Sequence, residues 1–353
     1  MMDGFSYSRA EALRLLSLRG ESRSELFHSA DQVRREVMGD AVHVRGIIEF
    51  SNICANDCLY CGIRASNRKI RRYTLDADQV LEVARRMYDC GQTTIVLQSG
   101  EAASPRGDLA LGDLIRRIKR EIPLAVTLSV GNRTRDIYAA WRDCGMDRYL
   151  LRFETTDATL FRRLHPDCTL EERIECLETL KELGVETGSG FMIGLPGERL
   201  DTLADNILLC RRMDFDMIGI GPFIAHPDTP LGGCRNVHEG DPEMFFVALA
   251  VLRLFNPDAH IPATTAFDAV FPDTGRDLAL RRGANIFMPN NTPIEHRRDY
   301  LLYPNKPCVD EDPGQCANCV ILRLRALGRT VGRGRGDSVK VRRKTGDGSL
   351  APS

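Results

Sequence analysis

The sequence predicts a complete (β/α)8 barrel of the TIM type, with a helical extension before it and a cysteine-containing segment after it. Short runs rich in β-branched residues alternate with charged, helix-forming stretches over most of the 353 residues. About eight such runs can be counted. No GxGxxG motif follows an early run, which disfavours a dinucleotide-binding sheet. A barrel with six complete units is the alternative.

The predicted elements follow one another in a simple order. Residues 8–38 carry apolar side chains at helical spacing and Gly39 is a typical stop, so residues 1–40 form the helical extension. The barrel occupies residues 41–328, with the C-terminal cysteine motif beginning at residue 300. Residues 329–353 are rich in Gly and Arg with little to bury, so we expect a basic, flexible tail; a nucleic-acid-binding arm is the alternative. The strands are expected at residues 43–50, 93–99, 124–130, 147–153, 185–193, 216–223, 260–266 and 285–289.

Composition excludes several classes of function. The 48 Lys and Arg residues balance 49 Asp and Glu, so there is no electrostatic case for nucleic acid or for an acidic membrane surface. The sequence has no apolar run long enough to span a membrane, and its first residues lack the apolar core of a secretion signal. We therefore expect a cytoplasmic protein. In that compartment, tight groups among its 12 cysteines indicate metal ligands or catalytic groups rather than disulfides.

The first cysteine group directly follows the first predicted strand. The segment SNICANDCLYCGIR places Cys54, Cys58 and Cys61 at CxxxCxxC spacing, in a loop that can curl around one metal centre. Three thiolates on a [4Fe–4S] cubane leave one iron open to bind substrate, whereas electron-transfer clusters normally have four cysteines. Structural zinc usually takes four protein ligands, and no fourth Cys or His lies nearby. A zinc site with three protein ligands and a water is the alternative.

The second cysteine group lies beyond the last predicted strand. Cys308, Cys316 and Cys319 have Cx7CxxC spacing. This spacing fits a second iron–sulfur cluster ([2Fe–2S] or [4Fe–4S]), a zinc site or a redox pair, and it does not choose among them. Its position places it outside the barrel interior.

The CxxxCxxC loop with an aromatic residue, Tyr60, before its third cysteine is similar to the motif of the radical S-adenosylmethionine (SAM) superfamily. The resemblance implies that SAM binds the open iron and is cleaved reductively to methionine and a 5′-deoxyadenosyl radical. Each residue in question also has an ordinary structural role: a Glu that ends a strand is commonly a cap, and Arg173 can pair with Glu175 or Glu178. The SAM contacts that the resemblance implies, most of them near the C-terminal ends of strands, are Tyr60, Gln98, Glu101, Thr127, Ser129, Glu154, Arg173 and Met192.

A closer resemblance covers about residues 8–328. The segments RGIIEFSNICANDCLYCGIR, TIVLQSGE, DRYLLRFET, IGIGPFIAHPDTPL, MPNNTP and YLLYPNKPC resemble the radical SAM maturases of [FeFe]-hydrogenase. This implies an anaerobic enzyme that helps to build the diiron subcluster from a cysteine-bound Fe(CO)2(CN) species. For the two arginines at the fourth strand, a structural ion pair inside the barrel is the alternative. The residues implied to line the substrate cavity are Arg148, Arg152, Thr264, Thr265, Met288, Tyr300 and Tyr303.

The same resemblance implies the partners and defines the competing functions. The substrate would come from a tyrosine-cleaving maturase, a GTPase scaffold maturase would act with the enzyme, and ferredoxin or flavodoxin would supply electrons; nucleic acid and membrane are not expected. Biotin synthase is disfavoured, because it holds a second cluster on strand cysteines and none of the expected strands contains one. Methylornithine synthase is the nearer enzymatic alternative. A non-catalytic iron–sulfur carrier or scaffold would not need the SAM contacts.

Overall fold

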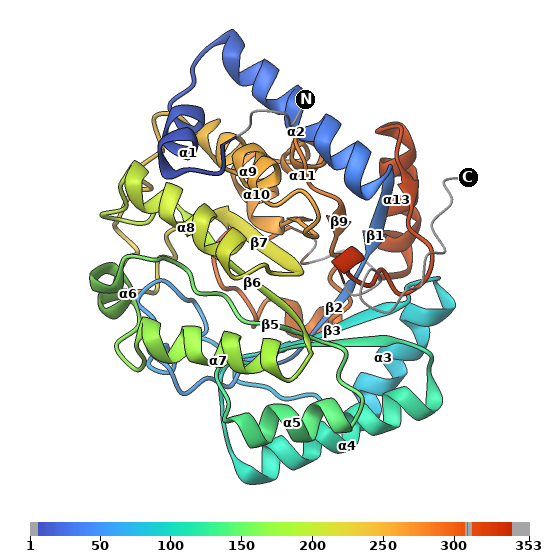
Figure 1. Cartoon of the computed structure of the whole chain (residues 1–353). Coiled ribbons are helices and arrows are strands. Elements are labelled where there is room, and N and C mark those ends of the chain that lie inside the picture. The colour runs from blue at the N-terminus through green and yellow to red at the C-terminus, as the bar shows by residue number, and fades with distance from the viewer. Residues whose placement is uncertain (1–5, 308, 310–312, 341–353) are drawn as a thin grey trace.

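The computed structural model describes residues 6–307, 309 and 313–340, without the side chains of 313–319. Parallel strands form a central ring that is surrounded by helices (Figure 1). The strands are β1 (Ala41–Val44), β2 (Gly46–Ser51), β3 (Thr94–Ser99), β4 (Ala125–Ser129), β5 (Arg148–Leu150), β6 (Glu186–Ile193), β7 (Met217–Pro222), β8 (Pro262–Ala263), β9 (Ile286–Phe287) and β10 (Thr330–Val331). The helices are α1 (Arg9–Leu16), α2 (Glu21–Met38), α3 (Ala77–Asp89), α4 (Pro105–Glu121), α5 (Arg135–Asp143), α6 (Ala158–Leu164), α7 (Leu170–Glu182), α8 (Leu200–Arg212), α9 (Met244–Phe255), α10 (Thr265–Val270), α11 (Gly275–Leu280), α12 (Ile294–Arg297) and α13 (Pro313–Ala326).

The predicted (β/α)8 barrel is confirmed. β2 to β7 form one parallel sheet in chain order, and β8, β9, β1 and β10 form a second sheet. Only Arg45 separates β1 from β2, so these two strands act as one bent strand shared by both sheets. An isolated parallel bridge between Met217 and His260 joins β7 to the segment before β8. With β1 and β2 counted once, β1 to β9 give eight strand positions among the described residues.

Local sequence explains where the helices begin and what they bury. Asp76 and Gln79 form a capping box at the start of α3, and Thr169 and Glu172 form another at α7. Each pair satisfies two backbone N–H groups that a helix start leaves without partners. Helix α9, with the sequence MFFVALAVLRLF, is buried along its whole length because it lies between the barrel and the N-terminal extension.

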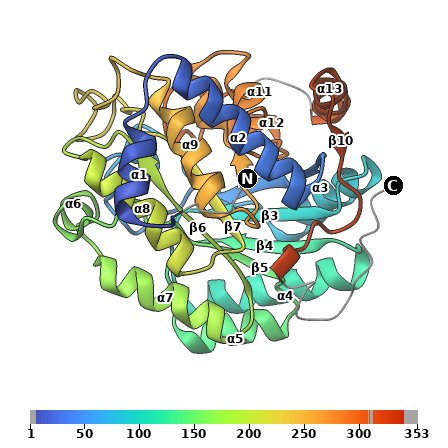
Figure 2. The same ribbon diagram turned by 45° about the horizontal axis from the view of Figure 1, so that its top comes forward.

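The N-terminal extension consists of two helices rather than one, because the chain turns at Gly20, whose φ is 56°. Helix α1 packs on α8 and α9, and α2 packs along α9 (Figure 2). The extension therefore covers one side of the barrel. No helix among the described residues is long and apolar enough to cross a membrane.

The prediction of a flexible tail from residue 329 is wrong for residues 329–340. β10 pairs in parallel with β1, and Arg329 donates hydrogen bonds to the backbone oxygens of Asp40 and Leu280. Gly334 and Gly336 have positive φ values of 69° and 59°, so glycines that suggested disorder instead allow specific turns. Residues 341–353 lie outside the described part of the chain.

Candidate active site at the C-terminal end of the barrel

The first cysteine group lies in the loop that leaves the C-terminal end of β2. The Arg72 guanidinium donates hydrogen bonds to five backbone oxygens of this loop, those of Asn52, Ile63, Arg64, Ala65 and Asn67. Gly100 follows β3 against the loop, and a Cβ there would lie 2.7 Å from Cβ of Cys54 and closer still to the Ile53 oxygen. The curl of the loop is thus held by backbone bonding and by a close approach that only glycine permits.

The three loop cysteines are free thiols, each partly exposed. Burial raises the pKa of all three, to about 12 for Cys61, and the neighbouring thiol charges raise it further for Cys58 and Cys61. Thiolates placed this close together favour a bound cation centre. No three ligating side chains in the described ranges form a single-ion site, and cubane ligands, which bind different irons, do not need one. The donor set therefore fits an iron–sulfur cluster.

Tyr60 lies between the cysteines and an apolar cluster that contains Met192. Its hydroxyl is 2.8 Å from Nε2 of His165, and its ring packs against the cluster formed by Leu160, Leu164, Met192, Leu195 and Phe223. Burial, and then the charges of Glu154, Cys58 and Cys61, raise the pKa of Tyr60. Burial and the charge of Arg173 lower the pKa of His165 to about 3, so its imidazole is neutral. Sequence reasoning missed His165, because a single His after a helix gives no signal.

Glu154 lies just beyond the C-terminal end of the fourth barrel strand position, and Arg173, from the start of α7, reaches the Arg152 oxygen beside it at 3.4 Å. Glu154 has a φ of 63°, a strained conformation for a residue with a side chain and one that is common at functional sites. Its Oε2 lies 3.1 Å from Nη2 of Arg152, yet this buried oxygen receives no hydrogen bond. Nη2 of Arg173 is 3.9 Å from Oε2 of Glu101, and its buried Nε also has no hydrogen-bond partner. Each such buried atom costs about 1–3 kcal/mol, which a polar ligand would recover.

Three of the remaining predicted SAM contacts, Gln98, Glu101 and Ser129, border the same mouth of the barrel. Gln98 and Ser129 are register partners at the ends of β3 and β4. Thr127 lies deeper in the barrel, in register with Val96 and Arg148; it is fully buried, and its Oγ1 has no hydrogen-bond partner. The Glu101 carboxylate lies against Gly131, where any Cβ would collide with it.

The barrel interior also gathers most of the predicted cavity residues. The hydroxyls of Thr265 and Tyr303 are hydrogen-bonded, and that of Tyr300 lies 3.3 Å from Nε2 of Gln98. Oγ1 of Thr264 donates to the Ile220 oxygen at 2.8 Å. Met288 packs with the buried side chains of Val96 and Ile286.

Sequence reasoning missed an ion pair in this interior. Nζ of Lys306 pairs with Oε1 of Glu49, and it donates to the backbone oxygen of Tyr300 at 3.2 Å. Oε2 of Glu49 accepts from Nδ2 of Asn290 at 3.1 Å. The signal was present, because Glu49 is the one carboxylate in the otherwise apolar segment GIIEF of a strand expected to be buried.

The prediction that Arg148 lines the cavity at the end of the fourth strand is wrong. Arg148 is the first residue of β5 and therefore lies at the opposite, N-terminal end. Its Nε donates to Oε2 of Glu186 at 2.7 Å, and its Nη2 pairs with Asp337. The alternative of a structural ion pair holds for Arg148, whereas Arg152 remains beside Glu154.

The second cysteine group cannot be assembled from the described residues. Cys308 lies outside them, and Cys316 and Cys319 belong to α13 in a stretch whose side chains are not described. The second iron–sulfur cluster therefore stays a prediction.

Comparison with known proteins identifies the family. Residues 48–210 match the model of the radical SAM superfamily, and this range contains the cysteine loop. The chain is 46% identical over 336 residues to the [FeFe] hydrogenase maturase subunit HydE of Thermotoga maritima, an alignment that covers 95% of each protein. The chain belongs to the HydE family of radical SAM enzymes. This family assignment implies a [4Fe–4S] cluster and SAM, in agreement with the donor set of the loop.

Other relatives are more distant from this HydE-family chain. It is 26% identical over 305 residues to the 3-methylornithine synthase of Methanosarcina acetivorans, which covers 85% of each protein. The crystal structure of methylornithine synthase (PylB) superposes with a TM-score of 0.79 over 94% of this chain and 96% of that one, at 23% identity. That likeness supports the fold alone.

Proposed function

We propose that this HydE-family enzyme acts in maturation of the [FeFe]-hydrogenase diiron subcluster, on a cysteine-bound Fe(CO)2(CN) species. The observation that carries the proposal is the 46% identity to HydE over 95% of both chains. The identity to 3-methylornithine synthase is 26%. The barrel supports the assignment, because its polar residues gather at the C-terminal end, where barrel enzymes place their active sites.

Cys54, Cys58 and Cys61 would hold the [4Fe–4S] cluster, which when bound supplies the electron that cleaves SAM. Glu154 and Arg173 would bind polar groups of SAM, since each has a buried atom without a hydrogen-bond partner. Met192 and the Tyr60 ring offer an apolar surface for the adenine. Gln98, Glu101, Thr127 and Ser129 would contact the methionine and ribose parts.

The substrate would occupy the barrel interior below the SAM site. Arg152, Thr264, Thr265, Met288, Tyr300 and Tyr303 would line this space, and Arg148 is left out because Glu186 and Asp337 already neutralise it. Arg152 can offer a positive charge to an anionic iron–cyanide group, because Glu154, its ion-pair partner at 3.1 Å, would also bind SAM and a buried anion needs a cation beside it. The Glu49–Lys306 pair would hold residues 300–306, and with them both tyrosines, across the interior.

The partners follow from this role. A tyrosine-cleaving maturase would supply the organometallic substrate, a GTPase scaffold maturase would receive the product, and ferredoxin or flavodoxin would reduce the cluster. Support comes from the relative's description as a maturase subunit.

The test is the release of 5′-deoxyadenosine by anaerobically reconstituted, reduced protein. The cysteine-bound iron–carbonyl–cyanide complex is compared with lysine, dethiobiotin and no substrate. Release stimulated only by the iron complex is the expected result. Stimulation by lysine would instead favour a mutase, stimulation by dethiobiotin a sulfur-inserting enzyme, and no release at all a non-catalytic carrier.

A further inference from the structure

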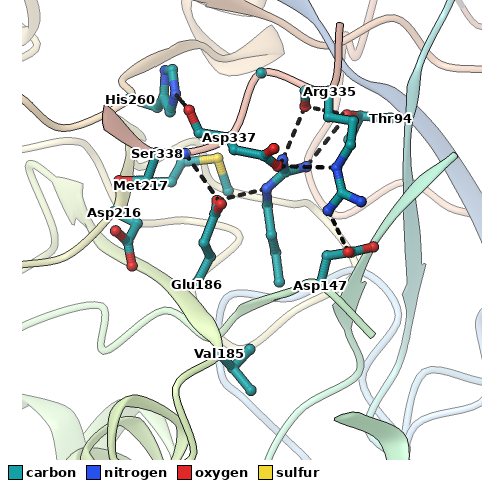
Figure 3. Close-up of polar contacts among 12 residues, drawn as sticks. Thr94, Asp147, Val185, Glu186, Asp216, Met217, His260, Arg335, Asp337 and Ser338 are labelled. Carbon is teal, nitrogen blue, oxygen red and sulfur yellow. Dashed lines mark hydrogen bonds and ion pairs between the residues drawn. The ribbon is translucent and has the colours of Figure 1, made fainter. Parts of the chain in front are cut away.

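The C-terminal segment 332–340 lies across the N-terminal ends of the barrel strands (Figure 3). Its backbone and side chains bond to the starts of β3, β5 and β6 and to residues just before β7 and β8. Four of these five hydrogen bonds join residues more than a hundred positions apart in sequence, and the fifth, between His260 and Asp337, joins residues 77 positions apart. The contacts include Thr93 to the Gly334 oxygen, Thr94 to the Arg335 oxygen at 2.9 Å, Arg45 to the Gly336 oxygen at 2.8 Å, the Ser338 N–H to Glu186 at 3.1 Å, and Lys340 to Asp214 at 2.6 Å.

Charge explains why this segment is needed. Arg45 and Arg148 are 1% and 2% exposed at this end of the barrel. Glu186 from β6 supplies one carboxylate to Arg148, and Asp337 of the segment supplies a second. Removing Asp337 would take away one of the two carboxylates that pair with Arg148 and would weaken the negative field at Arg45, which is unfavourable for cations buried away from water.

The segment also fits its place closely. Gly336 has a φ of 59°, and a Cβ there would lie 2.8 Å from Nδ1 of His43. Gly332 approaches the same imidazole even more closely. Both glycines therefore let the backbone come nearer to the barrel than any other residue would allow.

The inner face of β3 shows what the segment covers. Thr94, Val96 and Gln98 alternate with outward residues and therefore share this face. Thr94 bonds to the segment, Val96 packs with Ile286 and Met288, and Gln98 reaches Tyr300. The segment thus lies directly beneath an apolar layer, and the candidate active site lies above that layer.

We propose that residues 332–340 form a floor that closes the N-terminal mouth of the barrel and keeps small solutes out of its interior. Radical chemistry requires such exclusion, because a solvent-borne molecule would react with the radical before the substrate does. The inference rests on the proposed function only in treating the interior as the reaction chamber. Its test needs neither SAM nor substrate, so a failed hydrogenase-maturation assay would leave it intact.

The test places a reporter thiol in the apolar layer. Val96→Cys is made in the full chain, in a chain ending at Lys340 and in a chain ending at Val331. Each protein, with its cluster reconstituted, is treated with iodoacetamide, and alkylation at position 96 is followed by peptide mapping. We expect about tenfold faster alkylation in the chain ending at Val331, because its floor is missing. The chain ending at Lys340 keeps the floor and should match the full chain.

If the chain ending at Val331 does not fold, a point variant of the full chain tests the same proposal. Asp337→Asn in the full chain removes one charge at nearly constant volume, and the exposed Arg333→Gln in the same segment is the matched control. We expect faster alkylation at position 96, and faster amide hydrogen exchange at the starts of β5 and β6, in Asp337→Asn but not in Arg333→Gln. Equal rates in Asp337→Asn and the full chain would overturn the proposal, as would equal rates in a folded chain ending at Val331.

Discussion

The two ends of the barrel bury charged residues in different ways. At the N-terminal end, Arg148 has partners in Glu186, Asp337, Thr94 and the Arg335 oxygen. At the C-terminal end, Arg173 is 8% exposed and the Glu154 side chain is 12% exposed, and each keeps a buried atom without a hydrogen-bond partner. At the N-terminal end, Arg45 Nε and Arg329 Nη2 also have no hydrogen-bond partner, although both guanidinium groups donate to backbone oxygens of the chain. A buried charge whose partners come from its own chain is structural, whereas unsatisfied atoms gathered beside the three loop cysteines mark a place for a ligand.

The largest expected effect comes from substitutions of the cluster ligands at the C-terminal end of the barrel. Cys54→Ala, Cys58→Ala or Cys61→Ala should each reduce SAM cleavage to background, because the cluster loses one of its three ligands. The measurement is 5′-deoxyadenosine release after reconstitution. Exposed Cys90→Ala is the matched control, and Cys316→Ala should be far milder because its group lies beyond the last barrel strand. Wild-type cleavage in any of the first three variants would refute the assignment of the cluster ligands.

The next largest effect comes from a substitution in the buried ion pairs at the N-terminal end of the barrel. Arg148→Gln should lower the free energy of unfolding by about 3–5 kcal/mol, because it leaves the buried Glu186 without its ion-pair partner, whereas Asp337 keeps Arg335. Urea unfolding measures this loss, and SAM affinity should be nearly unchanged. Arg142→Gln, at an exposed ion pair, should change stability by less than about 1 kcal/mol. Similar losses in the two variants would contradict a structural role for Arg148.

Arg173→Gln tests the same comparison at the C-terminal end of the barrel, where SAM affinity rather than stability should change. It should weaken SAM binding by about ten- to a hundredfold, the range expected for a lost charge-assisted hydrogen bond. Its cost in stability should be smaller than that of Arg148→Gln. Anaerobic calorimetry on reconstituted protein measures the affinity, with exposed Glu178→Gln in the same helix as control. Unchanged affinity would remove Arg173 from the SAM site.

The last expected effect concerns the pH dependence of stability, and near neutral pH it is small. Burial and Arg173 lower the pKa of His165 from 6.5 to about 3 in the folded protein. The unfolded chain therefore takes up this proton below about pH 6.5 while the folded chain does not, so stability falls with falling pH by up to about 1.4 kcal/mol per unit between these values. His165→Gln should make that slope shallower, whereas exposed His28→Gln serves as the control. Identical slopes in wild type and His165→Gln would show that His165 is not held neutral.

Sequence reasoning predicted the parts of the molecule that depend on residues close together in the sequence. Short, largely apolar runs marked the barrel strands, and the spacing of Cys54, Cys58 and Cys61 marked the loop after the first strand. The position of Arg148 was predicted wrongly because a single strand runs from one end of the barrel to the other. Periodicity alone does not say at which end of the strand a residue lies. The floor and the Glu49–Lys306 pair were missed because they join residues far apart in sequence.

The central claim is that the unsatisfied polar groups at the C-terminal end form a SAM site beside a cluster on the three loop cysteines. The most direct measurement is the electron paramagnetic resonance spectrum of the reduced, reconstituted cluster before and after SAM is added. We predict that SAM changes this spectrum in the wild type and in Arg148→Gln, and that it changes it far less in Arg173→Gln. A cluster spectrum that is insensitive to SAM in the wild type would contradict the account.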